Sequence, residues 1–467
     1  MDEISKKIET GNLGQTLPTG VHKIGRWIQH AGGRMVIVGG CLRDLLLDRA
    51  IHDWDLATDL PPDQLRRAVP KSFDVGARFG TLLIPADGEI FEVTTFRRES
   101  DYSDFRHPDS VEFTMELSED LNRRDFTMNA MAWDPTAPQN LIDPHDGRTD
   151  LSHRVIRAVG EPKDRIREDA LRILRAVRFA VQLDFSIEPC TLNAMSESAA
   201  LVDHLSSERI RDELNKILLS PKPSTGFLLL KQIDVLRRIL PEIAECDGIT
   251  QNRFHAYDVF EHTLAATDAA AQDHLIVRLA TLFHDIGKPA TRTVEEDVHF
   301  YGHQFVSAQK AGAIMNRLRY SNEERRKVKH LIRHHMFFFQ TEWTDSAVRR
   351  FVRDVGMENI PDLFELRKAD TAGSGKRRAN ASRKLQELWD RIQEVLEKDN
   401  AFSVRDLAID GNDIMRELGV TPGRVIGDAL HHLLELVLED PELNTPESLI
   451  RELKEWYARN KHPEATG

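Results

Sequence analysis

The chain has 467 residues, with 63 Lys and Arg against 76 Asp and Glu, so its formal net charge is −13. Charges of both signs are intermixed and 40% of the residues are hydrophobic, which argues against a disordered or fibrous chain. Net acidity disfavours indiscriminate binding of polyanions but leaves room for a local basic groove. No apolar run approaches the ~20 residues of a membrane span, and no signal peptide is recognisable, so we expect a cytoplasmic protein without a membrane partner. The three cysteines are far apart, which disfavours disulfides and thiolate metal sites.

The first third of the chain mixes strand and helix patterns, and the remainder is helical in pattern. Short apolar or alternating runs predict strands at Met35–Val38, Asp53–Ala57, Thr81–Ile84 and Ile90–Thr95. Apolar residues at helical spacing predict helices at Ile166–Val181, Ser206–Leu219, Ser224–Leu240 and Ala256–Ala270. We therefore predict an α+β fold, with a small head containing a mixed sheet and helices, followed by an all-α remainder.

A glycine pair separates a predicted strand from a predicted helix. Gly39 and Gly40 follow the apolar run, and Arg43 lies in the next turn. Glycines at such a junction let backbone N–H groups approach an anion, and a helix N-terminus favours negative charge. On its own, the pair is explained more simply by a tight turn that needs a positive φ.

Two aspartates one residue apart, Asp53 and Asp55, fall in a predicted strand. Side chains two positions apart on a strand project from the same face, so both carboxylates would point the same way. Paired hard oxygen ligands suit Mg²⁺ bound together with phosphates. A solvated surface pair explains the pattern equally well. Glu92, on a later strand, is either a third carboxylate of this group or an exposed strand residue.

Two further segments combine cations with acceptors. Arg124 and Asp125 could bind a phosphate and a ribose hydroxyl, or form a surface ion pair. Asp169 and Arg172 lie three residues apart on one face of a predicted helix. An acceptor beside a guanidinium can pair with the edge of a base; the alternative is an ordinary ion pair on a charged helix. Basic residues continue at the same spacing at Arg175 and Arg178.

In order and spacing, six segments resemble the class II tRNA nucleotidyltransferase and bacterial poly(A) polymerase family, within the polymerase-β-like nucleotidyltransferase superfamily. The segments are GGCLRD (Gly39–Asp44), DWDLAT (Asp53–Thr58), RRESDYSDFRHPDSVEF (Arg97–Phe113), RRDFTMNAM (Arg123–Met131), IDPHDGRTDL (Ile142–Leu151) and EDALRILRAVRFA (Glu168–Ala180). Agreement of several motifs makes coincidence implausible. The resemblance implies a nucleotidyltransferase head followed by a helical neck and body.

The resemblance also implies roles for individual residues. Asp53 and Asp55 would be catalytic and hold Mg²⁺. Asp169 and Arg172 would read the incoming base, so that no nucleic-acid template is needed. The remaining implied nucleotide contacts are Gly39, Gly40, Arg43, Arg124, Asp125, Arg175 and Arg178.

The implied partners are tRNA, CTP and ATP, and the implied reaction adds C, C and A to the tRNA 3′ end with release of pyrophosphate. Alternatives with the same head are an A-adding tRNA nucleotidyltransferase and a poly(A) polymerase. CCA addition is favoured because the loop at Arg98–His107 is present and because Val75–Ile84 departs from the poly(A) polymerase pattern. An alternative from another class is a phosphohydrolase whose head only binds RNA. The oligomeric state is left open.

A second group of chemical residues lies in the helical part: His262, the adjacent pair His284 and Asp285, and the distant Asp370. This set resembles the core of HD-domain metal-dependent phosphohydrolases. It implies a bound divalent metal (Mn, Ni, Fe, Zn or Mg) and hydrolysis of a phosphate ester, or a metal that only braces the fold. His303, His334 and His335 would form a second metal site or bind phosphate.

Four domains are predicted from these patterns. They are a nucleotidyltransferase head at 19–150, a nucleotide- and RNA-binding neck and body at 151–247, an HD domain at 248–375 and a helical, tRNA-binding tail at 376–467.

Overall fold

The computed structural model describes residues 17–74, 80–100, 110–137, 141–251, 256–340, 342–375, 381–398 and 403–460. Most of the Arg98–His107 loop and the first half of Val75–Ile84 lie outside these residues. The chain divides into two compact units. The first comprises Met1–Ala244 with Asn316–Tyr320, and the second comprises Glu245–Met315 with Ser321–Gly467.

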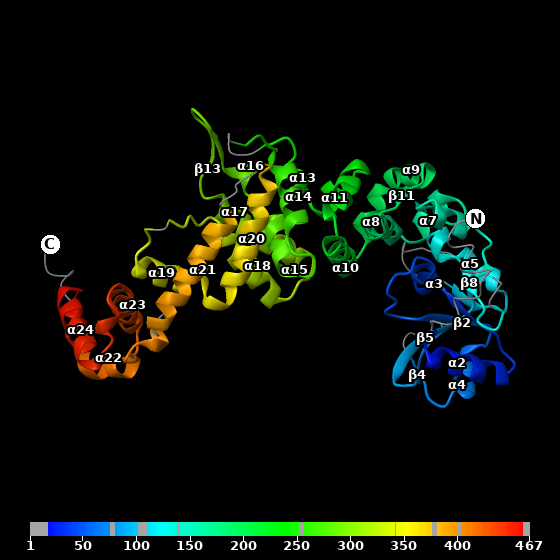
Figure 1. Cartoon of the computed structure of the whole chain (residues 1–467), viewed down its shortest axis with the longest axis horizontal. Helices are drawn as coiled ribbons and strands as arrows, with labels where there is room; N and C mark the ends of the chain where they lie inside the picture. The colour runs from blue at the N-terminus through cyan, green and yellow to red at the C-terminus, as the bar shows by residue number, and fades with distance from the viewer. Residues whose placement is uncertain are drawn as a thin grey trace. The chain divides into compact units, whose positions relative to one another are not determined.

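The first unit contains a sheet with seven strands among the described residues, in the order β3-β4-β5-β2-β1-β8-β9 (Figure 1). The strands are β1 (Met35–Val38), β2 (Asp55–Thr58), β3 (Phe73–Asp74), β4 (Thr81–Ala86), β5 (Glu89–Thr95), β8 (Ala132–Trp133) and β9 (Leu141–Ile142). Strands β2 and β5 are parallel, and the other neighbouring pairs are antiparallel. All four residues of β1 are buried, as its uninterrupted apolar sequence predicts.

Helices pack on the sheet and then continue the first unit beyond it. Helices α2 (Thr19–His30) and α3 (Gly39–Leu46) both contact β1. A separate ribbon pairs β6 (Arg97–Ser100) with β7 (Ser110–Phe113). The other helical elements are α4 (Pro62–Ala68), α5 (Leu117–Asn122), η3 (Thr127–Asn129), α6 (Gly147–Ser152), α7 (Pro162–Glu168), α8 (Leu171–Leu183), α9 (Pro189–Glu197), η4 (Ala199–His204), α10 (Ser207–Leu218), α11 (Pro223–Gln232), α12 (Leu236–Ile239) and α13 (Pro241–Ala244).

The second unit is built mainly from helices. Helices α14 and α20 pack so closely that a Cβ on Gly373 would lie 2.6 Å from the backbone nitrogen of Ala266. The helical elements are α14 (Val259–Ala269), α15 (Leu275–Phe283), α16 (Lys288–Thr291), α17 (His303–Arg317), α18 (Asn322–His334), α19 (Asp345–Val355), η5 (Met357–Asn359), α20 (Ile360–Gly373), α21 (Ala381–Lys398), η6 (Val404–Asp406), α22 (Gly411–Leu418), α23 (Arg424–Glu439), η7 (Pro441–Leu443) and α24 (Pro446–Asn460). Residues of α22, α23 and α24 share a separate apolar cluster.

Three predictions about local structure are wrong. Strand β2 begins at Asp55, so Asp53 precedes the strand. The helix predicted at Ile166–Val181 is interrupted between α7 and α8, because the Asp169 carboxylate accepts a hydrogen bond from the backbone N–H of Leu171 and replaces a helical partner. The helix predicted at Ser224–Leu240 is also broken, at Asp234, whose φ is +62°.

Strands also occur beyond the head, contrary to the all-α expectation. Strand β10 (Val155–Ile156) pairs in parallel with β11 (Ser186–Ile187). Strand β12 (Arg292–Val294) forms a hairpin with β13 (Val298–Phe300). Two- and three-residue strands carry too short a pattern to be recognised, and β10 and β11 are in addition paired across about 30 residues of sequence.

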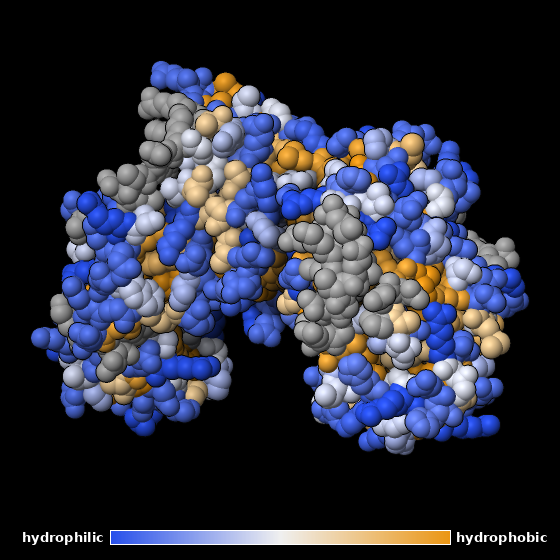
Figure 2. All heavy atoms as spheres, turned by 45° about the vertical axis from the view of Figure 1, so that its right-hand side comes forward, coloured by the Kyte–Doolittle hydropathy of each residue, from blue (hydrophilic) through white to orange (hydrophobic). Residues whose placement is uncertain are grey.

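Within the described residues, we find no helix with the length and apolar character needed to cross a membrane. Hydrophilic residues predominate on the face shown in Figure 2, where hydrophobic residues form smaller patches.

The contact between α6 and η3 allows a test of the fold. A Cβ on Gly147 would lie 2.2 Å from the carbonyl oxygen of Thr127, which is backbone and cannot rotate away. Gly147→Ala should therefore lower the free energy of unfolding by about 1–3 kcal/mol, measured by thermal or denaturant unfolding. Gly427→Ala is the control, because Gly427 is an exposed residue of α23 where an added Cβ would have open space around it. Gly427→Ala should raise the free energy of unfolding by about 0.5–1 kcal/mol. A Gly147→Ala chain as stable as the wild type would contradict the close contact between Gly147 and Thr127.

Candidate functional site

A charged cavity of about 1180 Å³ lies in the first unit. Its lining comes from the sheet, from α3 and β6, from the residues that follow α5, and from α8 and α10. All eleven residues predicted for the catalytic and nucleotide contacts line it: Gly39, Gly40, Arg43, Asp53, Asp55, Arg124, Asp125, Asp169, Arg172, Arg175 and Arg178. Segments more than a hundred residues apart in the chain therefore meet at one cavity.

The glycine turn combines a positive φ with a close approach. Gly39 has φ of +73°, as a tight turn requires. A Cβ at this position would lie 3.0 Å from Nη1 of Arg124 and 3.2 Å from Oδ2 of Asp55. A side chain on residue 39 would therefore crowd both charged groups as well as strain the backbone.

Carboxylates gather where β2 begins. Asp55 pairs in register with Glu92 on the parallel neighbour β5, and the exposed Asp53 lies just before the strand. Glu92 is an exposed strand residue that also lines the cavity, and its membership of the carboxylate group stays a prediction. Burial raises the pKa of Asp55 to about 6; the charges of Glu92 and Asp53 add to this rise, and Arg124 opposes it. Crowded hard oxygen ligands of this kind fit Mg²⁺.

Asp125 is the centre of a buried polar network. Its Oδ1 accepts hydrogen bonds from the backbone N–H of Phe126 at 2.8 Å and from Nδ2 of Asn129 at 3.0 Å. Its Oδ2 accepts from Nε of Arg175 at 2.8 Å. Asn129 in turn accepts a hydrogen bond from Nη1 of Arg43 at 2.9 Å. One aspartate and one amide thus connect α3, η3 and α8.

Asp169 and Arg172 do not form the ordinary ion pair that is the alternative to base reading; among the described residues each has other partners. Arg172 donates to Oε2 of Glu168 at 2.5 Å and to the carbonyl oxygen of Arg123 at 3.0 Å. Asp169 instead accepts from Nη2 of Arg209 at 2.7 Å. Both residues line the cavity, but each is held by another partner.

Three cavity arginines surround the ring of Phe179. The guanidinium carbons of Arg43, Arg175 and Arg178 lie 4.9, 5.4 and 4.1 Å from the ring centroid. An aromatic ring attracts a guanidinium within about 6 Å of its centroid, so the ring of Phe179 helps to hold the three arginines near one another. Arg178 also pairs with Glu213 of α10 at 2.6 Å.

Sequence reasoning missed several cavity residues. They include Asn129, Phe179, Arg209 and Lys216. Asn129 and Phe179 lie inside two of the motifs given above, RRDFTMNAM and EDALRILRAVRFA, so these motifs could have indicated them. Arg209 and Lys216 carry no such signal, because only the packing of α10 against α8 brings them to the cavity.

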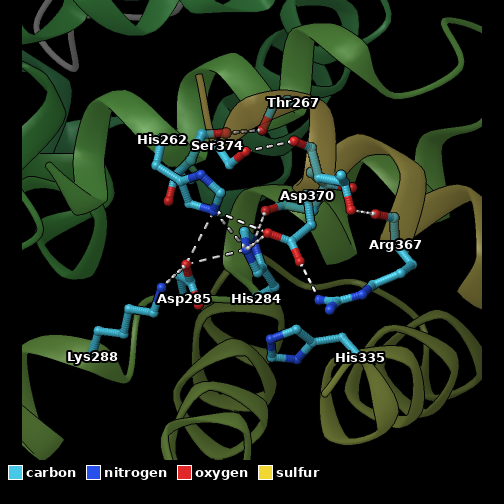
Figure 3. Close-up of polar contacts among 12 residues, drawn as sticks. His262, Thr267, His284, Asp285, Lys288, His335, Arg367, Asp370 and Ser374 are labelled. Carbon is cyan, nitrogen blue, oxygen red and sulfur yellow. Dashed lines mark hydrogen bonds and ion pairs between the residues drawn. The ribbon is translucent and has the colours of Figure 1, made fainter. Parts of the chain in front are cut away.

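Imidazoles and carboxylates converge in the second unit (Figure 3). The ligand atoms of His262, His284 and Asp285 lie within 4.8 Å of one another, and all three residues are buried. Oδ1 of Asp370 lies 3.2 Å from Nε2 of His262 and 3.6 Å from Nε2 of His284. The structure thus brings the four residues predicted for the HD site together. Lys288 contacts Asp285 at 2.6 Å, and Arg367 contacts Asp370 at 2.6 Å.

The orientation of the His284 ring is the one that a metal ligand in this group would need. Nδ1 of His284 lies 2.7 Å from the carbonyl oxygen of Thr281. A carbonyl oxygen only accepts, so Nδ1 donates and the neutral ring keeps a lone pair on Nε2, the atom that faces the carboxylates. Burial alone would lower the pKa of His284, but the Asp285 and Asp370 carboxylates outweigh it and raise the pKa to about 10. The two buried carboxylates therefore need positive charge nearby, which a bound divalent cation would supply.

A further pair of histidines adjoins the group, and one predicted residue does not join it. The ligand atoms of Asp285, His303 and His335 lie within 4.8 Å of one another. The structure does not bring His334 into this group: the centroid of its ring lies 4.5 Å from that of the His330 ring. Successive residues at a helix end point in different directions, so His334 and His335 cannot both face one centre.

Comparisons with known families match three segments of the chain. Residues 35–157 match the "Poly A polymerase head domain", and residues 184–247 match the "Probable RNA and SrmB- binding site of polymerase A". Residues 300–453 match "tRNA nucleotidyltransferase domain 2". The first segment contains the glycine turn and the cavity residues Asp53, Asp55, Glu92 and Asp125, whereas Asp169 lies outside all three segments.

Individual relatives agree with these matches. The chain is 49% identical to the CCA-adding enzyme of Pediococcus pentosaceus over 200 residues, which are 43% of this chain and 50% of that protein. It is 34% identical to the CCA-adding enzyme of Lactobacillus delbrueckii subsp. bulgaricus over 417 residues, covering 88% of this chain and 91% of that protein. A crystal structure of the Bacillus stearothermophilus CCA-adding enzyme in complex with CTP superposes with a TM-score of 0.70 at 27% identity, covering 95% of this chain and 98% of that one. This chain therefore belongs to the CCA-adding enzyme family.

Proposed function

We propose that the chain is a template-independent CCA tRNA nucleotidyltransferase, which adds C, C and A from CTP and ATP to the 3′ end of tRNA with release of pyrophosphate. The observation that carries this proposal is one cavity in which Asp53 and Asp55, at the start of β2, meet the arginines of α8 in a member of the CCA-adding enzyme family. The A-adding and poly(A)-tailing alternatives keep the same cavity, and product length separates them.

The cavity residues suit a nucleoside triphosphate. Asp53 and Asp55 would hold Mg²⁺, which when bound supplies Lewis-acid stabilisation of the phosphate charge. Arg43, Arg124 and Arg175 offer fixed guanidinium groups to the triphosphate, and their partners hold them before the nucleotide arrives. The tRNA 3′-hydroxyl oxygen forms a bond to the α-phosphorus as the bond to the pyrophosphate oxygen breaks, and positioning is the main contribution of the protein.

Asp169 and Arg172 would select the base. A carboxylate only accepts hydrogen bonds and a guanidinium only donates them. Cytosine and adenine both carry an exocyclic amino donor beside a ring-nitrogen acceptor, whereas uracil and guanine carry a carbonyl oxygen in place of that amino group. An acceptor and a donor side by side therefore match C and A and reject U and G.

Asp125 is assigned a positioning role. The resemblance implies contact with ribose or phosphate, but both oxygens of its carboxylate already accept hydrogen bonds from protein groups. We assign it to holding Arg175 and Asn129 at the cavity wall.

The second unit would carry a metal-dependent phosphohydrolase. His262, His284, Asp285 and Asp370 would hold a divalent metal that polarises a phosphate ester when bound. Support comes from the convergence of their ligand atoms and from the orientation of the His284 ring. The helical tail, α22 to α24, is proposed to bind tRNA, as the resemblance implies.

The two activities should separate by mutation. Asp53→Asn with Asp55→Asn should lower nucleotide addition by ~10³-fold or more, because the carboxylates that hold Mg²⁺ are lost, and should leave phosphohydrolase activity unchanged. Radiolabelled CTP incorporation into tRNA lacking CCA measures the first activity. Asp63→Asn, on the exposed face of α4, is the control and should retain full addition. Normal addition by the double variant would contradict the metal assignment.

Metal should stabilise the second unit. After treatment with a chelator, Mn²⁺ or Ni²⁺ should raise the melting temperature of the wild-type chain, because a ligand that binds only the native state stabilises it. His284→Gln should lose this shift and the hydrolysis of a phosphate ester. His274→Gln is a matched control on the first residue before α15, where His274 pairs with Asp362 away from the metal group. Equal shifts in all three chains would refute the site.

The role of Asp125 predicts a pH dependence. Burial alone would raise the pKa of Asp125, but Arg175 and Asn129 outweigh it and hold the pKa well below its usual 3.8. A depressed carboxyl pKa stabilises the native state above the unfolded pKa and loses this effect on acidification. The difference in unfolding free energy between wild type and Asp125→Asn should thus be about 1–3 kcal/mol at pH 7 and shrink below about pH 4. A pH-independent difference between pH 7 and acid would contradict the ion pair.

A further inference from the structure

Five charged residues of alternating sign form a row along one wall of the cavity in the first unit. Nε of Arg97, on β6, donates to Oε1 of Glu99 at 2.7 Å, and the same oxygen accepts from Nη1 of Arg123 at 3.3 Å. Arg123 and Arg124 in turn both donate to Asp120 of α5. The three arginines and Glu99 line the cavity, and Asp120 lies behind them. The row therefore links the β6–β7 ribbon to the cavity arginines that follow α5.

Asp120 holds two of these cations with separate oxygens. Oδ1 accepts from Nε and Nη2 of Arg123 at 3.0 and 2.6 Å, and Oδ2 accepts from Nη2 of Arg124 at 3.0 Å. Exposed ion pairs three or four residues apart are common on helices and fix their side chains only weakly. Asp120, however, is 1% exposed. A carboxylate buried in this way needs fixed partners to offset its desolvation, so both guanidinium groups are held in place.

Arg124 keeps donors for a ligand although Asp120 holds one end of its guanidinium group. Its Nε atom is buried and has no hydrogen-bond partner among the described residues. Its Nη1 atom would lie 3.0 Å from a Cβ on Gly39, which would also lie 3.2 Å from Oδ2 of Asp55. The group thus lies beside the glycine turn and the carboxylates of the cavity. A buried N–H without a partner is costly, and a phosphate oxygen would satisfy it.

We propose that Asp120 is a positioning residue for nucleotide binding, which fixes Arg123 and Arg124 as a pair of guanidinium groups that binds a phosphate of the nucleoside triphosphate. The proposal rests on the function proposed above, which gives Arg124 to the triphosphate, and it adds Arg123 and the buried acid behind both. Guanidinium groups match phosphate oxygens in geometry and charge. Without the Asp120 carboxylate, the two cations would repel each other and Arg124 would turn towards the nearby Asp55.

Substitution of Asp120 tests the proposal in the full-length chain. Asp120→Asn keeps the side-chain volume but removes the charge, and its amide turns a donor towards one of the two arginines. We expect KM for CTP to rise about 10- to 100-fold. The dissociation constant for CTP, measured by equilibrium dialysis without tRNA, should rise with it. KM for tRNA should not change, and Asp120→Glu, which restores the charge, should recover part of the affinity for CTP.

Asp150→Asn is the matched control. Asp150 is also buried, at 5% exposure, and its Oδ2 lies 3.0 Å from Nε of Arg157 in the same unit. Neither residue is among those that line the cavity. Asp150→Asn should therefore lose stability in thermal unfolding, as Asp120→Asn does, while it binds CTP like the wild type.

A second variant gives an independent reading if Asp120→Asn folds poorly. Arg123→Gln removes the newly assigned cation and leaves Asp120 with Arg124. It should also raise KM for CTP, because one of the two guanidinium groups is lost. Unchanged KM for CTP in Arg123→Gln would overturn the proposed pair.

The other outcomes separate this proposal from the function on which it rests. A wild-type chain that neither binds CTP nor extends tRNA would overturn the proposed function. Wild-type affinity for CTP in Asp120→Asn would overturn the positioning role alone. Equal losses of CTP binding in Asp120→Asn and Asp150→Asn would overturn it as well, because the effect would then be one of general stability. A rise in KM for tRNA with unchanged CTP binding would assign the row to the RNA strand instead.

Discussion

The hydrogen bonds to Asp125 tie the helix that carries the cavity arginines to the segment that leads back into the sheet. Through Oδ2, Asp125 holds Arg175 of α8; through Asn129 it reaches Arg43 of α3. A guanidinium or carboxylate that leaves water must find such partners, because an unpaired buried charge is costly. The network therefore fixes cations at the cavity wall before any nucleotide is present. Groups that need no rearrangement stabilise developing charge most effectively.

The second unit also contains buried carboxylates that need positive charge nearby, but there the carboxylates face imidazoles. Three of the imidazoles that its carboxylates face, or that adjoin them, have Nδ1 tied to a backbone carbonyl, so that Nε2 keeps the lone pair that can bind a metal: His284, His303 and His335. In the first unit, arginines from neighbouring elements neutralise buried acids. In the second, Lys288 and Arg367 each contact one carboxylate, and the remaining positive charge must come from protons or metal ions. This difference suits phosphoryl transfer at one centre and hydrolysis at the other.

Local pattern predicted much of this chain, and tertiary contacts explain the rest. The β1 strand was predicted correctly because an uninterrupted apolar run is typical of a strand buried on both faces. The partners of Asp169 and Arg172 could not be predicted, because Arg209 is 40 residues from Asp169 and Glu168 competes for Arg172. Adjacent histidines at the end of α18 look alike in sequence, and only the packing of the unit separates His335 from His334. Motifs thus indicated which residues carry chemistry, and the fold determined which of them meet.

If one cavity reads the bases with protein groups alone, the same cavity builds the whole CCA end. The sharpest measurement is extension of a tRNA that stops at the discriminator base, resolved to single nucleotides in Mg²⁺. We expect two added residues with CTP alone and three with CTP and ATP together, after which extension stops. Extension of only a CC-ended tRNA, a long ladder of A residues, or no extension at all would contradict it.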